Sequence, residues 1–185
     1  KLDIPVMIDC FYGFRRSELI GLKWDAIDFE NKMISIKHKV LNVNGKFYLS
    51  DTLKTQASNR TLPLLPEIEK LLLKRKEEIE QNKKLYGKSY NYNFIDYVFV
   101  DDIGDLINPD HVSNRFRNML KKNKLKHLRF HDLRHSCASL LVASGVPMKN
   151  IQEWLGHSNF NTTADVYSHL DYSAKIESAS AISNA

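Results

Sequence analysis

The first quarter of the chain is dominated by helical patterns. Residues 2–14 form a nearly continuous apolar run, which predicts a buried helix. Residues 17–24 predict a second, shorter helix with Ser17 as its N-cap. Ile20, and not Glu or Gln, stands three residues after Ser17, so no capping box is expected.

The region that follows has the character of strands. Apolar and polar residues alternate at the start of residues 33–40, as in a half-buried strand. Asn44-Gly45 is a turn dipeptide, and residues 46–49 follow as a returning strand. Residues 60–64 give a third short strand. The pattern predicts a small antiparallel sheet of three strands.

The rest of the chain is predominantly helical. Pro66 stands at the first position of a helix predicted to end near residue 82, and residues 83–96 are polar and aromatic, as in an exposed excursion. A short apolar piece at 97–100 precedes further predicted helices at 109–122, 132–144, 147–155, 162–168 and 173–181. The fold class predicted is mainly α with a small three-stranded antiparallel β-sheet.

Composition narrows the class of protein. A chain of 185 residues with 43% hydrophobic and 26% charged residues fits one globular domain, or two small ones, and not a disordered or fibrous protein. It has neither a run of apolar residues that could span a membrane nor a signal-peptide pattern, so no membrane association is expected. The two cysteines are far apart in sequence, which argues against a disulfide scaffold and favours a cytoplasmic location.

Positive charge is concentrated in one segment. The net charge is +5, but residues 109–149 contain nine basic and two acidic side chains, so this segment carries +7 and the remainder −2. Such a segment indicates a phosphate-rich partner. A solvated, lysine-rich helix explains the charge equally well.

Two clusters of reactive side chains lie in the first third of the chain. Residues 13–18 place Arg15 and Glu18 at the junction of the two predicted helices, and residues 54–60 put Lys54 in a loop or at a strand end. Taken alone, each has an ordinary explanation. Arg15 and Glu18 can form a structural ion pair, and Lys54 can be an unremarkable turn lysine.

Two more clusters lie in the second half. His131 and Arg134 are three residues apart, on one face of a helix. His131 and His135 have a spacing that zinc proteins use, but the Glu of H-E-x-x-H is absent and no third ligand is evident, so no metal site is expected. Leu-Gly-His at 155–157 is followed ten residues later by Tyr167, which alone would be an ordinary packed tyrosine.

Together and in this order, the clusters resemble the catalytic motifs of the tyrosine recombinase, or phage integrase, family. G-x-R-x-S-E matches residues 13–18, K-T-x-x-S-x-R matches 54–60, H-x-L-R-H matches 131–135, and L-G-H followed by T-T and Y-x-H matches 155–169. The resemblance runs from about residue 12 to residue 169, nearly the whole chain. It implies a fold like that of the recombinase catalytic domain.

The resemblance also implies roles for individual residues. The active-site set is Arg15, Lys54, His131, Arg134, His157 and Tyr167, with Tyr167 as nucleophile and Glu18 as the acidic supporter of Arg15. The side chains expected to bind DNA are Arg16, Arg60, Arg115, Arg117, Lys121 and Lys122. Two departures are Tyr12, where threonine is common, and Arg16, which adds a charge beside Arg15.

The function that the resemblance implies is site-specific DNA recombination. Strands would be cleaved and rejoined through a covalent 3′-phosphotyrosine, without a metal or other cofactor, to integrate or excise a phage or mobile element. The expected partners are double-stranded DNA and other recombinase subunits in a tetramer on DNA, the isolated domain being monomeric, with an accessory DNA-bending protein as a further partner. A type IB topoisomerase-like nicking-closing enzyme and a non-catalytic DNA-binding protein of the same fold remain alternatives.

The domain organisation expected from the resemblance is that of a fragment. Family members carry a core-binding domain, and often an arm-binding domain, ahead of the catalytic region. Residues 1–185 are therefore expected to be a catalytic domain truncated at its N-terminus, without either of those domains.

Overall fold

The structure, a computed structural model, describes residues 3–51 and 59–157. The helices among these residues are α1 (Asp3–Tyr12), α2 (Arg16–Ile20), α3 (Pro66–Tyr86), α4 (Pro109–Lys122), α5 (Asp132–Ala143) and α6 (Met148–Leu155). The strands are β1 (Ile27–Asp28), β2 (Met33–Ile36), β3 (Lys39–Val43), β4 (Lys46–Ser50) and β5 (Arg60–Pro63). The prediction of a mainly α fold with a small antiparallel sheet is confirmed.

The strands form two sheets and not one. The three-stranded sheet has the order β1-β2-β5, and β3 and β4 form a separate hairpin. Ile36 of β2 pairs with Arg60 of β5, which fixes the register of β5. The predicted turn at Asn44-Gly45 is present, with φ of 51° and 80° at its two central residues, as a hairpin turn of this kind requires.

The prediction of one continuous strand over residues 33–40 was wrong, because the structure has two strands there, β2 and β3. The chain bends after Ile36, and β3 then packs against α2 at Gly21. A Cβ at Gly21 would lie 2.6 Å from Lys39 Cα, so only glycine allows this approach. The contact with α2 draws β3 out of the first sheet, and alternation along the chain cannot reveal such a contact.

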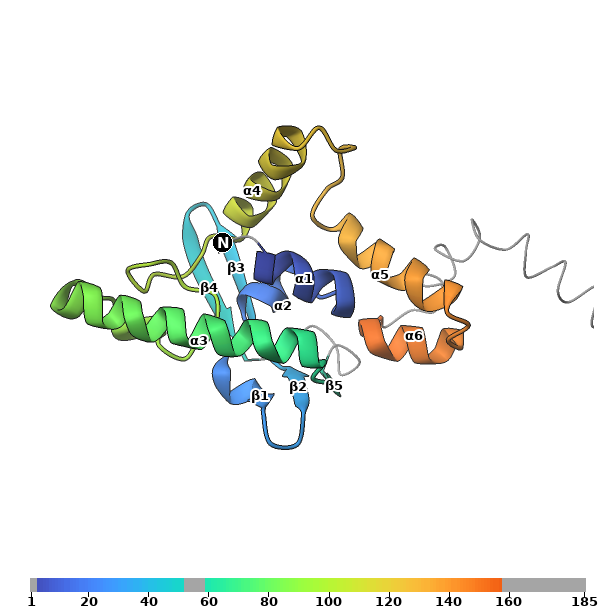
Figure 1. Ribbon diagram of the computed structural model, residues 1–185, viewed down its shortest axis with the longest axis horizontal. Helices are drawn as coiled ribbons and strands as arrows, with labels where there is room; N and C mark the ends of the chain where they lie inside the picture. Colours follow the sequence, from blue (N-terminus) through green and yellow to red (C-terminus); the bar gives the residue numbers. More distant parts are fainter. Residues whose placement is uncertain (1–2, 52–58, 158–185) are drawn as a thin grey trace, which may run out of the picture.

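Helix α1 lies at the centre of the molecule (Figure 1). Helices α5 and α6 lie together on one side of it, and the β3-β4 hairpin lies on the other. Ile8 and Tyr12 of α1 are fully buried, as expected for the apolar run. The Tyr12 hydroxyl donates to Pro63 O at 2.8 Å and accepts from Leu65 N at 2.9 Å, so α1 is tied to the end of β5 and the start of α3.

Several helix boundaries follow the sequence closely. Helix α4 begins at Pro109, ends at Lys122 as predicted, and is capped by the Asn108 side chain. Helix α3 runs four residues beyond its predicted end, to Tyr86. Ser17 is not an N-cap, because α2 begins one residue earlier and Arg15 takes the cap position.

The helices predicted at 162–168 and 173–181 lie outside the described residues. Within the ranges 3–51 and 59–157, no helix is both long enough and apolar enough to cross a membrane.

Candidate active site

The first component of the site is the junction between α1 and α2. Gly13 ends α1 with φ of 59°, a backbone conformation that favours glycine. A Cβ there would lie 2.7 Å from Leu155 Cδ2 and 3.3 Å from Arg134 Cγ. Glycine at position 13 therefore lets the side chains of α5 and α6 pack closely against the end of α1.

Glu18 holds Arg15 in place at this junction. The Glu18 carboxylate accepts from Arg15 Nη1 at 2.6 Å and from Arg15 N at 3.0 Å. Glu18 is only 3% exposed, whereas the Arg15 side chain is 37% exposed. The backbone bond is half of a capping box, contrary to the prediction, which has Ser17 as the cap in place of Arg15.

Arg60 of β5 is the second cation on the same carboxylate. Its Nη2 lies 3.1 Å from Glu18 Oε2, and its side chain is 6% exposed. Burial alone would raise the pKa of Glu18, but the charges of Arg60 and Arg15 and the hydrogen bonds from Arg15 outweigh it and lower the pKa. Glu18 is therefore a buried anion shared by two guanidinium groups.

Arg134 of α5 completes what we call the arginine cluster, Arg15, Arg60 and Arg134. It is 3% exposed, and its Nη1 donates to Gly13 O. Burial, followed by the charges of Arg15 and Arg60, lowers its pKa to about 9. At neutral pH the group remains protonated.

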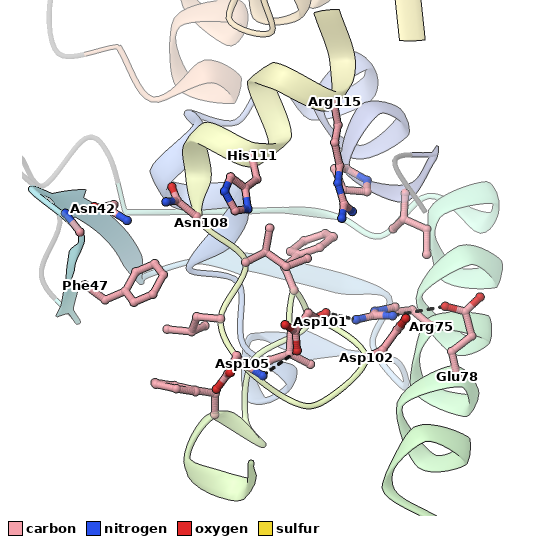
Figure 2. Close-up of a pocket in the computed structure, with 18 residues that line it drawn as sticks. Asn42, Phe47, Arg75, Glu78, Asp101, Asp102, Asp105, Asn108, His111 and Arg115 are labelled. Atoms are coloured by element: carbon pink, nitrogen blue, oxygen red, sulfur yellow. Dashed lines mark hydrogen bonds and ion pairs between the residues drawn. The ribbon is translucent and has the colours of Figure 1, made fainter. Parts of the chain in front are cut away.

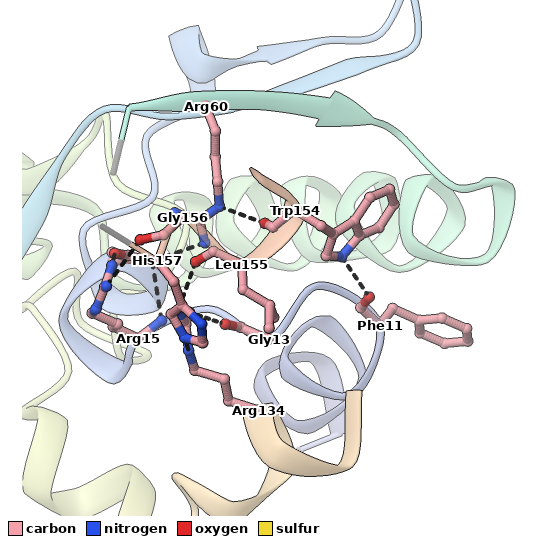
Figure 3. A network of polar contacts seen from close by, with 10 residues as sticks. Phe11, Gly13, Arg15, Arg60, Arg134, Trp154, Leu155, Gly156 and His157 are labelled. Atoms are coloured by element: carbon pink, nitrogen blue, oxygen red, sulfur yellow. Dashed lines mark hydrogen bonds and ion pairs between the residues drawn. The ribbon is translucent and has the colours of Figure 1, made fainter. Parts of the chain in front are cut away.

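The arginine cluster converges on the C-terminal end of α6 (Figure 3). Each guanidinium group donates to one of three successive carbonyls. The bonds run from Arg60 Nε to Trp154 O (2.8 Å), from Arg134 Nη2 to Leu155 O (2.6 Å) and from Arg15 Nη2 to Gly156 O (3.0 Å). The last carbonyls of a helix lack helical partners and carry partial negative charge, which cations stabilise.

The two histidines of the predicted set both lie close enough to Arg134 for its charge to affect their pKa values. His157 follows the end of α6, and its Nε2 lies 3.2 Å from Arg134 Nε. Burial and then the charges of Arg134 and Arg15 lower its pKa to about 4, so the ring is uncharged at neutral pH. His131 precedes α5 and is more exposed, and partial desolvation together with the charges of His135 and Arg134 lowers its pKa too.

A basic cleft adjoins this group. It has a volume of about 500 Å³, and its lining includes the basic side chains Arg16, Arg117, His127, Arg129 and His131. Arg16 also pairs with Asp110 at 2.9 Å and with Ser113 Oγ at 3.0 Å, so it links α2 to α4. Of the predicted DNA-binding residues, Arg16 and Arg117 thus lie beside His131.

The other predicted DNA-binding residues lie elsewhere. Arg115 lines a larger cavity of about 930 Å³ near the carboxylates of Asp101, Asp102 and Asp105 (Figure 2). Lys121 is exposed four residues after Arg117, on the same side of α4, and Lys122 is exposed seven residues after Arg115, on the side of Arg115. Arg60 is enclosed in the arginine cluster.

Sequence reasoning missed Asp9. This residue of α1 is fully buried, and among the described residues neither of its carboxylate oxygens has a hydrogen-bond partner. Burial raises its pKa to about 8, against the opposing charge of Arg134. The signal in the sequence was an Asp in the middle of the apolar run 2–14.

Two predicted residues, Lys54 and Tyr167, lie outside the described residues. In the described ranges, no three His, Cys, Asp or Glu side chains gather in a way that could hold a metal ion. The arrangement that the structure does describe, two buried arginines and one half-exposed arginine beside two histidines, suits the binding of an anion with several oxygens.

Comparison with known proteins identifies relatives along nearly the whole chain. The model of the phage integrase family matches residues 5–174. A tyrosine recombinase XerC-like protein of Caldanaerobacter subterraneus subsp. tengcongensis is 33% identical over 168 residues, which cover 85% of this chain and 43% of that protein. The ICEBs1 integrase of Bacillus subtilis is 30% identical over 158 residues, which cover 85% and 42%. The chain spans less than half the length of these two relatives.

Solved structures share the fold. A Tn1549 transposon integrase in complex with circular intermediate DNA matches 97% of this chain and 59% of its own, with a TM-score of 0.79 and 23% identity. The XerH site-specific recombinase bound to a palindromic difH substrate matches 97% of this chain and 45% of its own, with a TM-score of 0.66 and 24% identity. The predicted recombinase-type fold is confirmed, and since the family model matches 170 of the 185 residues (positions 5 to 174), the chain belongs to the phage integrase family.

Proposed function

We propose that this chain is the catalytic part of a site-specific DNA recombinase that cleaves and rejoins strands through a 3′-phosphotyrosine. The observation that carries the proposal is the pairing of Arg15 and Arg134 at one end of α6. Guanidinium groups bind two phosphate oxygens at once in a fixed geometry. Two of them, preorganised by Glu18 and by backbone carbonyls, would neutralise the charge of a pentacoordinate phosphoryl transition state.

Tyr167 is the proposed nucleophile. A phenol with a pKa near 10 is about one part in a thousand ionised at pH 7, a cost of roughly 4 kcal/mol. The positive charge around the phosphate offsets part of this cost by favouring the phenolate. Tyr167 gives its phenolic proton to the uncharged His131 ring, Oη attacks phosphorus, the Tyr–O–P bond forms, and the P–O5′ bond breaks.

Lys54 is the proposed general acid. Its ammonium group would transfer a proton to the departing 5′-oxygen, so that a 5′-hydroxyl leaves and not an alkoxide. The phosphotyrosyl bond is an ester, like the bond that it replaces. The 5′-hydroxyl of another strand therefore reverses the attack without an external energy source, which gives strand exchange.

The histidines enter this scheme as uncharged groups. With a pKa of about 4, His157 is neutral at the pH of the reaction and does not compete with the arginines as a cation. His131 lines the basic cleft and is proposed to hydrogen-bond the phosphate from that side. The charges and proton transfers of the step are supplied by side chains, and no cofactor enters the scheme.

Double-stranded DNA is the proposed substrate. The Tn1549 integrase and XerH structures that share this fold contain DNA. Arg16, Arg117 and Lys121 lie on or beside the basic cleft, from where they can reach phosphates next to the reacting one. The names of the relatives, integrase and transposase among them, favour integration or excision of a mobile element over the topoisomerase-like alternative.

The proposed assembly is a tetramer of the full-length protein on two DNA sites. Strand exchange between two duplexes needs four cleavages, one for each subunit. An accessory DNA-bending protein remains an additional proposed partner, and a cytoplasmic location is part of the proposal.

The test is recombination by the full-length protein between DNA fragments that carry the ends of its element and the matching target. Joined products and resolution of a synthetic four-way junction are expected. Relaxation of supercoiled DNA without either product would show that the protein is a nicking-closing enzyme and not a recombinase. DNA binding without any cleavage would show that the protein is a non-catalytic DNA-binding protein.

A further inference from the structure

Arg60 is buried like Arg134 and differs from the half-exposed Arg15 in what surrounds it. Its side chain is 6% exposed, compared with 37% for Arg15, and it packs over the Phe14 ring with its Cζ 5.6 Å from the ring centroid. Two of its guanidinium nitrogens donate to Glu18 and to Trp154 O. These protein contacts of Arg60 favour a role within the site over the DNA contact expected from sequence.

We propose that Arg60 is a positioning residue that places the Glu18 carboxylate and the end of α6 for the catalytic arginines. This inference rests on the proposed function. Arg60 binds Glu18 Oε2 while Arg15 binds Oε1, so one carboxylate is fixed from two directions. Without Arg60, Glu18 would be a 3%-exposed anion with Arg15 as its remaining guanidinium partner.

The second contact of Arg60 acts on α6. Trp154 O is the first of the three carbonyls that the arginine cluster binds, and Gly156 O, two residues on, holds Arg15 Nη2. His157 follows directly. Arg60 thus sets both anchors of Arg15, the carboxylate and the helix end, and through the helix end it sets the position of His157.

The main experiment separates positioning from DNA contact. In the full-length protein, Arg60→Gln is expected to leave DNA affinity and its salt dependence unchanged and to lower single-turnover cleavage at saturating DNA by about a hundredfold. The matched control is Arg117→Gln, which removes an exposed arginine and is expected to lower the salt slope by about one. An Arg60→Gln variant that loses salt slope and cleaves normally at saturating DNA would show that Arg60 contacts DNA.

A pH profile provides the readout that a merely structural role would not move. Removing the Arg60 charge raises the pKa of Glu18, so the acidic limb of the cleavage profile should shift to higher pH in Arg60→Gln. Arg60→Lys keeps the charge and should retain the wild-type limb while losing part of the rate. If Arg60→Gln fails to fold, the cleavage rate and the salt slope of Arg60→Lys test the proposal in its place. An unchanged limb in Arg60→Gln, or a wild-type rate in Arg60→Lys, would overturn the proposal.

Failure of the positioning role of Arg60 can be distinguished from failure of the proposed function. Equilibrium unfolding against pH needs neither DNA nor cleavage. The depressed pKa of Glu18 contributes stability above its unfolded pKa that is lost as pH falls through the folded value. The stability difference between wild type and Arg60→Gln should therefore shrink on acidification, even if the wild-type protein cleaves no DNA. A difference that is constant with pH would contradict the link between Arg60 and Glu18.

Discussion

The arginine cluster and the exposed arginines of α4 contain the same side chain in opposite environments. In the cluster, Arg134 is 3% exposed, and burial with neighbouring cations lowers its pKa to about 9. On α4, Arg117 is exposed and bonds only to Asn114 within its own helix at 2.9 Å, among the contacts described. The comparison teaches that fixed geometry, not charge, distinguishes a candidate catalytic arginine from one that serves affinity.

The largest effect is expected from Arg134→Lys. Lysine keeps the charge but cannot donate to Gly13 O, Leu155 O and His157 together, as the guanidinium does. Single-turnover cleavage by the full-length protein should fall by about a thousandfold, in line with the loss of a preorganised donor. Arg117→Lys, on the exposed side of α4, is the control and at saturating DNA should cleave within about twofold of wild type. Equal rates for the two variants would remove the distinction between the regions.

Glu18→Gln should have the next largest effect, on stability. The change leaves Arg60 and Arg15 without their buried anion, and breaking a buried pair typically costs about 3–5 kcal/mol in the free energy of unfolding. Asp132→Asn is the matched control, since Asp132 pairs with the exposed Arg129 at 2.8 Å and should cost about 1 kcal/mol or less. Chemical denaturation of both variants measures the difference, and similar losses would mean that burial does not matter here.

Asp9→Asn tests the buried carboxyl beneath the arginine cluster. The folded pKa of about 8 is raised above the unfolded value near 3.9, so the stability contribution is complete below pH 4 and is lost as pH rises toward 8. Asn cannot ionise. Its stability advantage over wild type should therefore grow by up to about 1.4 kcal/mol per pH unit across that window. Parallel stability profiles for the two proteins would show that Asp9 has an ordinary pKa.

The smallest effects are expected from removing an arginine on either side of α4. Arg117→Gln should weaken DNA binding modestly and lower the salt slope by about one, because Arg117 lines the basic cleft beside His131. Arg115→Gln should change the slope less, because Arg115 faces the cavity that contains Asp101, Asp102 and Asp105. Filter binding at a series of salt concentrations compares the variants. A larger loss for Arg115 would reverse the assignment of the DNA-facing side.

Much of the fold follows from local patterns. The start and end of α4 and the Asn44-Gly45 turn come from capping, proline and turn preferences within a few residues, and the sequence contains these directly. The division into two sheets depends on a contact between β3 and Gly21, which no local pattern carries.

The sequence was sufficient to predict which residues form the candidate site, but not how they are arranged in space. The motifs named Arg15, Arg134 and His157, and the structure brings them together at the end of α6. That Arg60 is enclosed could not be deduced, because its burial depends on Trp154, which lies 94 residues away in sequence. An exposed and a buried arginine are identical in sequence, so their roles separate only in three dimensions.

Covalent capture of DNA by the full-length protein tests the central claim most directly. A nicked suicide substrate from the element's end, which loses its 5′-hydroxyl strand by diffusion after cleavage, should accumulate a protein–DNA adduct with wild type. Mass spectrometry of the adduct should locate the phosphoryl group on Tyr167, and Tyr167→Phe should bind the same DNA and form none. An adduct that persists in Tyr167→Phe, or one that maps to another residue, would contradict the account.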